Sequence, residues 1–258
     1  GVNAYLVPTY GWQILFFSGI LSLIAAVYIV VFVPESPAWL KSQINKSEGR
    51  ESVSKTDVKA ASWRDILKGA NLKTTLLAFG LCASCLVSYW GAGSWIPAYL
   101  SAERGLNLKD MSGYLMILNV GGFIGYYFYG YLADKLGRRA NFIFGSLASA
   151  VVMLIWINLT SPTAILWMAG VFGFITYGYW GPPAAFVSEQ FPTNVRGIGT
   201  AFAYASGRMI SALAPFLLGG IASRYSLGFA LGLVSVIYAV GAIFGYLMKE
   251  TKDIIVVD

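Results

Sequence analysis

The sequence contains no histidine and only two cysteines among its 258 residues. The absence of histidine excludes a histidine-based catalytic triad and a zinc site built on imidazole ligands, and two cysteines provide no disulfide framework. Cys82 and Cys85 have a C-x-x-C spacing, but they lie inside a long apolar run rather than beside a strand. We therefore interpret them as packing residues of a helix, the usual role of a buried free cysteine.

Charge is also scarce, because Asp, Glu, Lys and Arg make up 12% of the residues, against roughly a quarter in an ordinary soluble domain. Hydrophobic residues make up 57%, and this composition excludes a water-soluble enzyme. The 18 cations exceed the 12 anions and give a net charge of +6, but 14 of the cations lie in alternate gaps between apolar runs. No basic stripe interleaves with exposed aromatics, so no nucleic-acid partner is expected.

Seven apolar runs are long enough to cross a lipid bilayer. A helix rises about 1.5 Å per residue and needs about 20 residues to cross roughly 30 Å of hydrocarbon. Helices also satisfy their own backbone hydrogen bonds, which an open chain in lipid requires. The sequence therefore predicts an all-α membrane protein with seven transmembrane helices, at residues 12–33, 74–100, 111–133, 140–159, 163–187, 197–223 and 227–248.

The distribution of lysine and arginine predicts the side that each gap faces. Eight, three, one and two cations lie in the gaps at 34–73, 134–139, 188–196 and 249–258. The gaps between them hold three cations, namely Arg104, Lys109 and Arg224. Because cytoplasmic loops carry the excess of positive charge, we expect the first set of gaps and the carboxy terminus in the cytoplasm.

This orientation divides the chain into three parts. The sequence opens with glycine, and its first run would start outside the cytoplasm, so we interpret it as the carboxy-terminal part of a longer protein. Residues 1–33 are expected to be the last helix of a missing first half, residues 34–73 a cytoplasmic linker, and residues 74–258 a complete six-helix bundle. In the linker, residues 62–67 have a capped amphipathic pattern, which predicts a surface helix with Trp63 and Leu67 dipping into the membrane.

Four charged motifs resemble those of the major facilitator superfamily. Gly130–Arg139 resembles the loop signature between that superfamily's eighth and ninth helices. Pro34–Leu40 resembles the turn after helix six, Glu189–Gly197 the turn between helices ten and eleven, and Lys249–Lys252 the exit from helix twelve. The motifs occur in the order and on the side that the helix count requires. The resemblance covers essentially the whole chain and implies helix six plus the six-helix second bundle of a facilitator-type transporter.

The charged motifs predict a network at the cytoplasmic helix ends. Asp134 ends one helix, and Arg138 begins the next after a tight turn at Gly137. Arginine offers carboxylates a planar fork of donors, and a network that forms in only one conformation biases a conformational equilibrium. The expected cytoplasmic gate network comprises Asp134, Arg138, Arg139, Glu189, Arg196 and Glu35. The alternative is that these charges only set the topology.

Arg208 is the exceptional charge because it lies inside an apolar run. It follows Arg196 by 12 residues, which places it roughly 18 Å along the helix and close to the bilayer midplane. Such a residue usually faces a cavity or a partner, since arginine at the centre of a membrane helix costs about 2.5 to 3.5 kcal/mol on insertion scales. No acid in this half lies at comparable depth, so the counter-ion is expected from the missing half or from a bound anion.

Aromatic and polar residues near this depth outline a candidate anion site. Tyr204 shares a helix face with Arg208, and Gly181-Pro182-Pro183 predicts a kink or opening near the middle of another helix. Taken singly, each uncharged residue also fits a packing role. The expected substrate-binding residues are Arg208, Tyr204, Asn119, Trp180, Tyr177 and Trp90.

Gly207 and Arg208, followed by Pro215 and a glycine pair, resemble the eleventh helix of the superfamily branch that contains proton symporters of organic and aromatic acids. The resemblance implies that Arg208 holds a substrate carboxylate. It also implies secondary active transport of a carboxylate metabolite or aromatic acid by alternating access, coupled to protons. The implied partners are this small organic anion, protons, the lipid bilayer and the missing amino-terminal half.

Three other functions fit the sequence less closely. A sugar carrier would typically have Gln and Asn in helix seven, and residues 82–95 contain neither. A drug or metabolite carrier would pair Arg208 with an acid of the first half, and a non-transporting receptor would resemble a transporter in sequence. No nucleophile-base pair or metal-ligand cluster lies in the apolar runs, so no enzyme, cofactor or metal is expected. The expected location is the plasma (inner) membrane.

Overall fold

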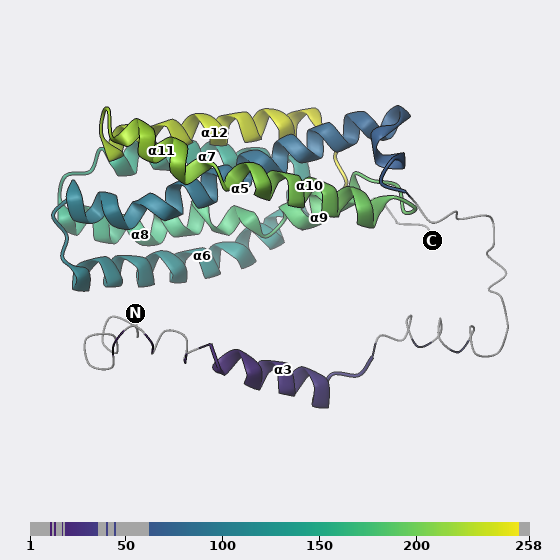
Figure 1. The fold of residues 1–258 in the computed structure, drawn as a ribbon, viewed down its shortest axis with the longest axis horizontal. Coiled ribbons are helices and arrows are strands. Elements are labelled where there is room, and N and C mark those ends of the chain that lie inside the picture. The colour runs from purple at the N-terminus through teal and green to yellow at the C-terminus, as the bar shows by residue number, and fades with distance from the viewer. Residues whose placement is uncertain are drawn as a thin grey trace. The chain divides into compact units, whose positions relative to one another are not determined.

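The protein is represented by a computed structural model, which describes residues 19–35 and 62–252 together with positions 11, 13, 17, 40 and 44. The chain divides into two units, Gly1–Ala60 and Ala61–Asp258, and each is described here by itself. In the first unit, α3 (Leu21–Phe32) forms part of the apolar run predicted at 12–33 (Figure 1). Its described side chains are exposed and hydrophobic, as expected of a helix that is covered by lipid or by other helices.

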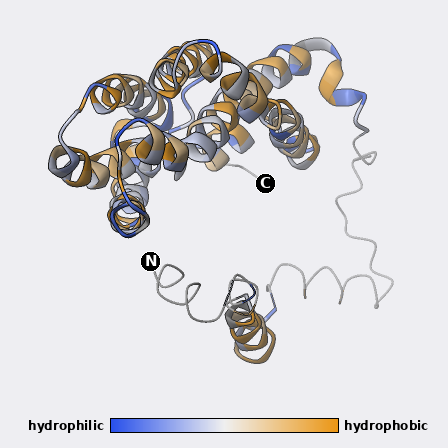
Figure 2. Cartoon of the chain, turned by 60° about the vertical axis from the view of Figure 1, so that its left-hand side comes forward, coloured by the Kyte–Doolittle hydropathy of each residue, from blue (hydrophilic) through white to orange (hydrophobic). Residues whose placement is uncertain are grey.

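Among the residues that the structure describes, the second unit contains helices joined by turns and no strand, which confirms the all-α prediction. Five of its helical segments are long and apolar enough to cross a membrane. Figure 2 shows hydrophobic residues along these helices and hydrophilic residues at many of the turns. The helices are η1 (Asp65–Leu67), α5 (Gly69–Ala102), α6 (Leu108–Leu136), α7 (Arg138–Ile157), α8 (Pro162–Thr176), η2 (Gly178–Trp180), α9 (Pro183–Glu189), α10 (Arg196–Ser211), α11 (Ala214–Ala222) and α12 (Leu227–Leu247).

Two of the predicted crossings are interrupted. The run at 163–187 forms α8, η2 and α9, with the break at Tyr177–Pro182, which confirms the kink predicted from the two prolines. The run at 197–223 forms α10 and α11, which lie end to end in Figure 1. Pro215 occupies the first turn of α11, where a missing N–H costs little, and the indole N–H of Trp95 donates to its carbonyl at 2.9 Å.

The long helices of this unit pack in a defined order, in which α10 lies on α5, α5 on α12, α12 on α7, α7 on α8, and α8 on α6. The α6–α8 contact is close because Gly121 faces the backbone of Gly170, and Gly173 faces the carbonyl of Leu118. The spans formed by α6 and by α10–α11 are the least buried of the five membrane-length segments. Their outer faces are therefore the surfaces that this unit offers to lipid or to another bundle.

The loops opposite the α6–α7 turn tie three helices together. Arg104 donates to the hydroxyl of Tyr99 at 2.8 Å and to the carbonyl of Ile157, at the end of α7, at 2.5 Å. Tyr99 donates to the same carbonyl at 2.8 Å. Glu103 accepts from the backbone N–H groups of Leu227 and Gly228 at 2.5 and 3.0 Å, which caps the start of α12. The carboxyl end of α5 is thereby fixed to both α7 and α12.

Replacing Gly121 by alanine is expected to loosen the α6–α8 contact. An added Cβ would overlap the carbonyl oxygen of Gly170, so the two backbones must separate. We expect Gly121→Ala to destabilise the folded state by about 1 to 3 kcal/mol, the usual cost of overpacking. The measurement is thermal unfolding of the purified protein in detergent.

Gly130→Ala is the matched control, because Gly130 lies on the same helix and an added Cβ there meets no atom within 4 Å. Alanine has the higher helix propensity, so this variant should be unchanged or more stable by up to about 1 kcal/mol. Equal unfolding temperatures for the two variants would contradict the close contact.

Candidate functional site

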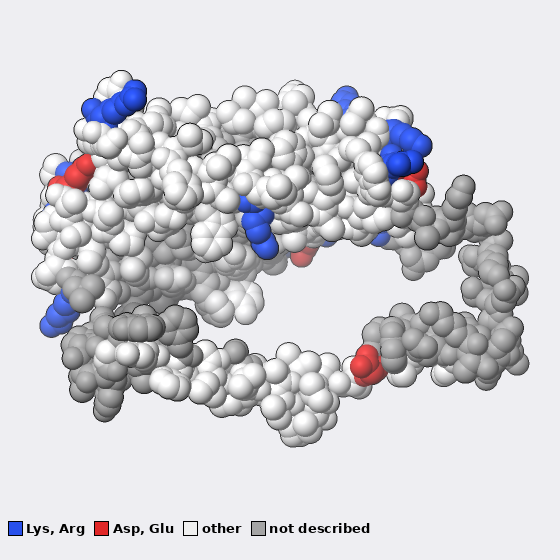
Figure 3. All heavy atoms as spheres, in the orientation of Figure 1, with Lys and Arg blue, Asp and Glu red and all other residues white. Residues whose placement is uncertain are grey.

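Arg208 lies near the middle of the α10–α11 segment, as the thirteenth residue of a 27-residue membrane-length span. Its guanidinium makes no hydrogen bond or ion pair with the part of the chain that the structure describes, and its side chain is exposed on the surface of the unit. Figure 3 shows charged side chains mainly at the two ends of this unit, with a basic side chain midway along the face in view. An unpaired cation at this depth calls for an anionic partner.

Arg208 lines an open pocket of about 220 Å³ together with Trp90, Ser211, Ala212 and Pro215. The pocket therefore joins Trp90 of α5 to the break between α10 and α11. The structure brings together two of the residues predicted from sequence, one cationic and one aromatic. An arginine beside an aromatic wall suits a small anion that has both a carboxylate and an apolar body.

Gly207 explains how Arg208 is held at this place. Gly207 is buried against α5, where an added Cβ would come within 3.0 Å of the backbone nitrogen of Ala83. Successive helical residues point about 100° apart, so the residue after this tight contact is directed away from the α5 backbone. The close approach at Gly207 thus sets both the distance of α10 from α5 and the direction of Arg208.

Tyr89, which the sequence analysis did not select, lies at the centre of an aromatic group that begins at the Arg208 pocket. Its ring centroid is 5.5 Å from that of Trp90, 5.0 Å from that of Tyr177 and 5.3 Å from that of Trp180. Three predicted aromatic residues from α5 and from the α8–α9 break are therefore connected through one unpredicted tyrosine. The signal that could have identified it is its position directly before Trp90 in a helix that faces the break.

The break between α8 and α9 leaves a hydrogen-bond donor unsatisfied. The indole N–H of Trp180 is buried and has no partner among the described residues. Tyr126 of α6 packs beside the same break, because an added Cβ at Gly181 would lie 3.4 Å from its ring. A buried donor without a partner costs about 1 to 3 kcal/mol, so the site suits an acceptor supplied by a ligand or by water.

Tyr204 and Asn119 are less closely connected with this group. Tyr204 is partly buried and packs against the hydrophobic core, one helical turn before Arg208. Asn119 is exposed on α6 and donates to the carbonyl of Leu115 in its own helix at 2.7 Å. The described contacts therefore connect Trp90, Tyr177 and Trp180 through Tyr89, and Trp90 lines a pocket with Arg208. Substrate binding by all six residues stays a prediction.

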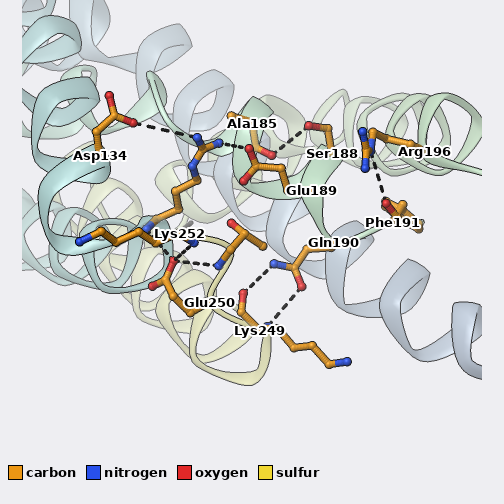
Figure 4. Close-up of polar contacts among 12 residues, drawn as sticks. Asp134, Ala185, Ser188, Glu189, Gln190, Phe191, Arg196, Lys249, Glu250 and Lys252 are labelled. Carbon is orange, nitrogen blue, oxygen red and sulfur yellow. Dashed lines mark hydrogen bonds and ion pairs between the residues drawn. The ribbon is translucent and has the colours of Figure 1, made fainter. Parts of the chain in front are cut away.

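The predicted gate network forms in part at the α6–α7 turn (Figure 4). Arg138, the first residue of α7, donates to Glu189 at the end of α9 and lies 4.0 Å from Asp134 of α6. The Arg138 and Glu189 side chains are 23% and 22% exposed, whereas Asp134 is 76% exposed. The bond between Arg138 and Glu189 is therefore the shielded one, and the contact with Asp134 is largely screened by water.

Glu250 also belongs to this network, although its position in the Lys249–Lys252 motif did not predict a role for it. Its carboxylate accepts from the backbone N–H groups of Arg138 at 2.9 Å and Arg139 at 3.1 Å, which caps the start of α7. Gly137 makes room for this cap, because its φ is +99° and an added Cβ would lie 2.5 Å from a Glu250 oxygen.

The carboxylate of Glu250 also accepts from the backbone N–H groups of Thr251 and Lys252, at 2.9 and 3.0 Å. Burial raises its pKa, but the four backbone donors outweigh burial and hold the pKa below its ordinary value. Because the pKa is lowered on folding, the stabilisation is present at neutral pH and is lost as the pH falls through that lowered pKa.

The other three predicted gate residues have different surroundings. Arg139 donates to the carbonyl of Tyr246 at 2.5 Å, with its guanidinium 4.8 Å from the centre of that tyrosine ring. Arg196 donates within its own turn, to Phe191 and Thr193 at 3.4 Å each, and to no carboxylate among the described residues. Glu35 belongs to the other unit, and its position relative to these residues is not determined. Within the second unit, the Arg196 side chain reaches back to the turn before α10, and its place in the gate network stays a prediction.

Among the described residues, no group of three or more His, Cys, Asp or Glu side chains is placed to hold a metal ion. Cys82 and Cys85 are both buried as free thiols, as the packing interpretation predicts. The hydroxyl of Tyr179 donates to the Cys85 sulfur at 3.8 Å. The chemistry of this unit is therefore carried by one mid-depth arginine, an aromatic group and a charged network at one end.

Comparison with known proteins shows that the sequence is similar to a family of transporters. The sequence profile of the Major Facilitator Superfamily matches residues 1–215. A cis,cis-muconate transport protein of Acinetobacter baylyi is 32% identical over 251 residues, which cover 96% of this chain and 59% of that protein. A probable 4-methylmuconolactone transporter of Cupriavidus pinatubonensis is 28% identical, with coverage of 97% and 56%.

A sialic acid transporter of Escherichia coli K12 is 26% identical to the chain, with coverage of 92% of the chain and 57% of that protein. All three of these proteins are named as transporters. The chain spans less than two thirds of the length of each of them.

The shielded bond between Arg138 and Glu189 is expected to show a large coupling energy in a double-mutant cycle. We expect the cycle of Arg138→Gln and Glu189→Gln to give about 1 to 3 kcal/mol, as for a charge-assisted hydrogen bond. The measurement is unfolding in detergent of the two single variants and the double variant. A second cycle that pairs Arg138→Gln with Asp134→Asn serves as control, with an expected coupling of about 0 to 0.5 kcal/mol. Equal couplings in the two cycles would show that Glu189 is no more shielded than Asp134.

Proposed function

Because this chain belongs to the major facilitator superfamily, we propose that it is the carboxy-terminal half of a membrane carrier for a small organic anion. The family and the apolar helices make it part of an integral membrane protein. The names of similar proteins include carriers of muconate and niacin, which are organic acids. The proposed substrate is therefore a carboxylate metabolite or an aromatic acid.

The observation that carries the proposal is the unpaired guanidinium of Arg208 at mid-span, beside Trp90. Arg208 would hold the carboxylate through two parallel hydrogen bonds, for which the planar guanidinium is shaped. Trp90 and Tyr89 would contact the apolar body of the substrate, and the buried N–H of Trp180 would donate to one of its oxygens. A few fixed donors in a mainly aromatic pocket give orientation as well as affinity.

The chain would correspond to one helix of the first half followed by the second bundle. In this proposal, residues 1–33 close the amino-terminal half, residues 34–73 are a cytoplasmic linker, and residues 74–258 form the second bundle. The start of the second unit at Ala61 and of α5 at Gly69 supports a boundary before residue 74. The missing half would cover the exposed faces of α6 and α10 and would complete the site around Arg208.

Alternating access would use the network at the α6–α7 turn as an inner latch. The bond between Arg138 and Glu189 joins the start of α7 to the end of α9, and α9 follows the break that carries Trp180. Movement of α9 relative to α7 therefore stretches this bond. A bond present in one state and absent in the other shifts the balance between inward-facing and outward-facing forms.

Proton coupling would require a titratable group near the substrate. The acids in the described part of the second unit all lie at helix ends or in the segment before α5. These are Asp65, Glu103, Asp110, Asp134, Glu189 and Glu250. A coupling carboxylate in the membrane would therefore come from the other half of the carrier.

A drug or metabolite carrier is the alternative function, and it differs from the proposed function in the partner of Arg208. In such a carrier, an acid of the first half would pair permanently with Arg208, and the aromatic group would bind an uncharged or cationic compound. A non-transporting receptor finds no support in the names of the three compared proteins, because all three are named as transporters. The Arg208 variants described below separate an anion site from a permanent ion pair.

We expect Ser62 and Ser101 to lie on opposite faces of the membrane, because the excess of lysine and arginine before α5 predicts that this end faces the cytoplasm. Both serines are exposed, and the native Cys82 and Cys85 are buried. An impermeant thiol reagent should therefore label Ser62→Cys only from the cytoplasmic side and Ser101→Cys only from outside. Labelling of both from one side would overturn the proposed orientation.

Substitution of Arg208 is expected to weaken substrate binding more than it weakens folding. Arg208→Lys keeps the charge but loses the planar fork, and Arg208→Gln loses both, so the second change should be the more severe. Loss of a charge-assisted hydrogen bond of about 1.5 to 3 kcal/mol corresponds to roughly a ten- to hundredfold loss of affinity. The measurement is binding of a radiolabelled organic acid, with muconate as the first probe, to the complete purified protein.

Arg224→Gln is the control, because it removes an exposed cation at the end of α11 without touching the pocket. Folded yield is measured for each variant by size-exclusion chromatography. Unchanged affinity in well-folded Arg208→Gln would reject the anion site. Poor folding of Arg208→Gln, with normal affinity in Arg208→Lys, would favour a permanent ion pair with the first half.

A further inference from the structure

A second pocket, at the opposite end of α5 from Glu103, has no role in the proposed transport site. Its volume is about 300 Å³, and it lies between the start of α5, the end of α12 and the turn after α9. Its lining combines two lysines and two uncharged polar residues with three apolar residues. These are Lys73, Lys249, Thr74, Gln190, Leu77, Leu247 and Met248.

The ammonium groups of Lys73 and Lys249 are exposed and make no hydrogen bond or ion pair with the described parts of the chain. Gln190 fixes the backbone of Lys249, since its amide N–H donates to the Lys249 carbonyl at 2.7 Å and its oxygen accepts from the Lys249 N–H at 3.2 Å (Figure 4). The backbone of Lys249 is therefore held in place, while its ammonium group has no partner among the described residues. Such a pair of cations attracts a ligand with negative charge.

The apolar part of the pocket lies at the ends of two membrane-length helices. Leu247 is the last residue of α12 and is 53% exposed, and Leu77 is in the third turn of α5. The two lysines lie near the ends of these helices. At such a position in a membrane, lysine stems can cover apolar surface while their charges reach the headgroup layer. A ligand that fills the whole pocket therefore has an anionic group joined to an apolar body.

The segment before α5 has the features of a membrane-surface element on the same helix. Ile66 is buried, and its carbonyl accepts from the Thr75 hydroxyl at 2.7 Å, which fixes η1 against the start of α5. Trp63 is 60% exposed with the Arg64 guanidinium 5.4 Å from its ring centre. Exposed tryptophan beside arginine and lysine is typical of residues at the lipid headgroups. This segment supports a lipid headgroup layer at the level of Lys73.

We propose that the pocket between Lys73 and Lys249 binds the phosphate of an anionic phospholipid, with the acyl chains along the exposed side of Leu247. A free phosphate would use the lysines but not the apolar wall, and a zwitterionic lipid would gain little from two unpaired cations. The proposal is independent of what the carrier transports. It predicts a structural lipid at the cytoplasmic end of the second bundle.

The test counts lipids retained by the complete purified protein, using native mass spectrometry with added palmitoyl-oleoyl phosphatidylglycerol. Each lysine near a membrane surface contributes about 1 kcal/mol to binding of anionic lipid, so Lys73→Gln with Lys249→Gln should weaken the tightest site roughly ten- to thirtyfold. Lys109→Gln with Arg224→Gln is the matched control, since it removes two exposed cations at the other end. Leu247→Ser should also weaken binding, because it removes the apolar wall. Unfolding temperatures confirm that the variants fold.

Three results would overturn the proposal. Equal losses in the two double variants would mean that general charge attraction, and not this pocket, retains the lipid. Equal retention of phosphatidylcholine and phosphatidylglycerol would mean that the lysines do not select for charge. Competition by inorganic phosphate or glycerol phosphate, with no effect of Leu247→Ser, would assign the pocket to a free phosphate.

Discussion

Within the part of the chain that the structure describes, Arg208 is a positive charge without a partner near the middle of a membrane-length helix, and the candidate site depends on this constraint. Arginine at that depth costs about 2.5 to 3.5 kcal/mol on insertion scales, and the residues that line its pocket carry no charge that would neutralise it. Gly207 holds the helix close to α5, and Trp90 forms the wall of the pocket. The acids of the described bundle stay at its ends, so the cation is left for a ligand or for the other half.

At each end of the bundle, a glutamate side chain caps the start of a helix. A glutamate outside each helix accepts from free backbone N–H groups at a helix start: Glu250 caps α7 at one end, and Glu103 caps α12 at the other. Each carboxylate pairs with backbone N–H groups that have no partner within the helix, and its negative charge is stabilised by the positive end of the helix dipole. Because α12 packs on both α7 and α5, these caps make the three helices one firmly connected block.

The parts of this architecture that follow from local patterns could be predicted from the sequence. The length of the apolar runs predicted the membrane-length helices, and Pro182 and Pro183 predicted the break between α8 and α9. Both features depend only on residues that are close together in the sequence. Tyr89 and Glu250 could not be assigned in this way, since their roles depend on helices about 90 and 110 residues away in the chain. The contacts of Arg196 with Phe191 and Thr193 in the turn before α10 were not predicted either, because the charge pattern indicates only ionic partners.

The breaks lie where movement costs least and where the ligand is expected. The α-helical pattern changes at Tyr177–Pro182 and at Ala212–Leu213, where Trp180 and Leu213 donate to the backbone carbonyl three residues earlier instead of four. A helix bends more readily at such a change of pattern than in a continuous α-helical stretch. Trp180 lies in the first break, and the second borders the Arg208 pocket. In the proposed carrier, a ligand that joins Arg208 to Trp180 would therefore contact both breaks, whereas Glu103 and Glu250 hold α5, α7 and α12 together at their ends. Binding at these two points would then favour movement of α9 relative to α7, which is the movement that the bond between Arg138 and Glu189 would oppose.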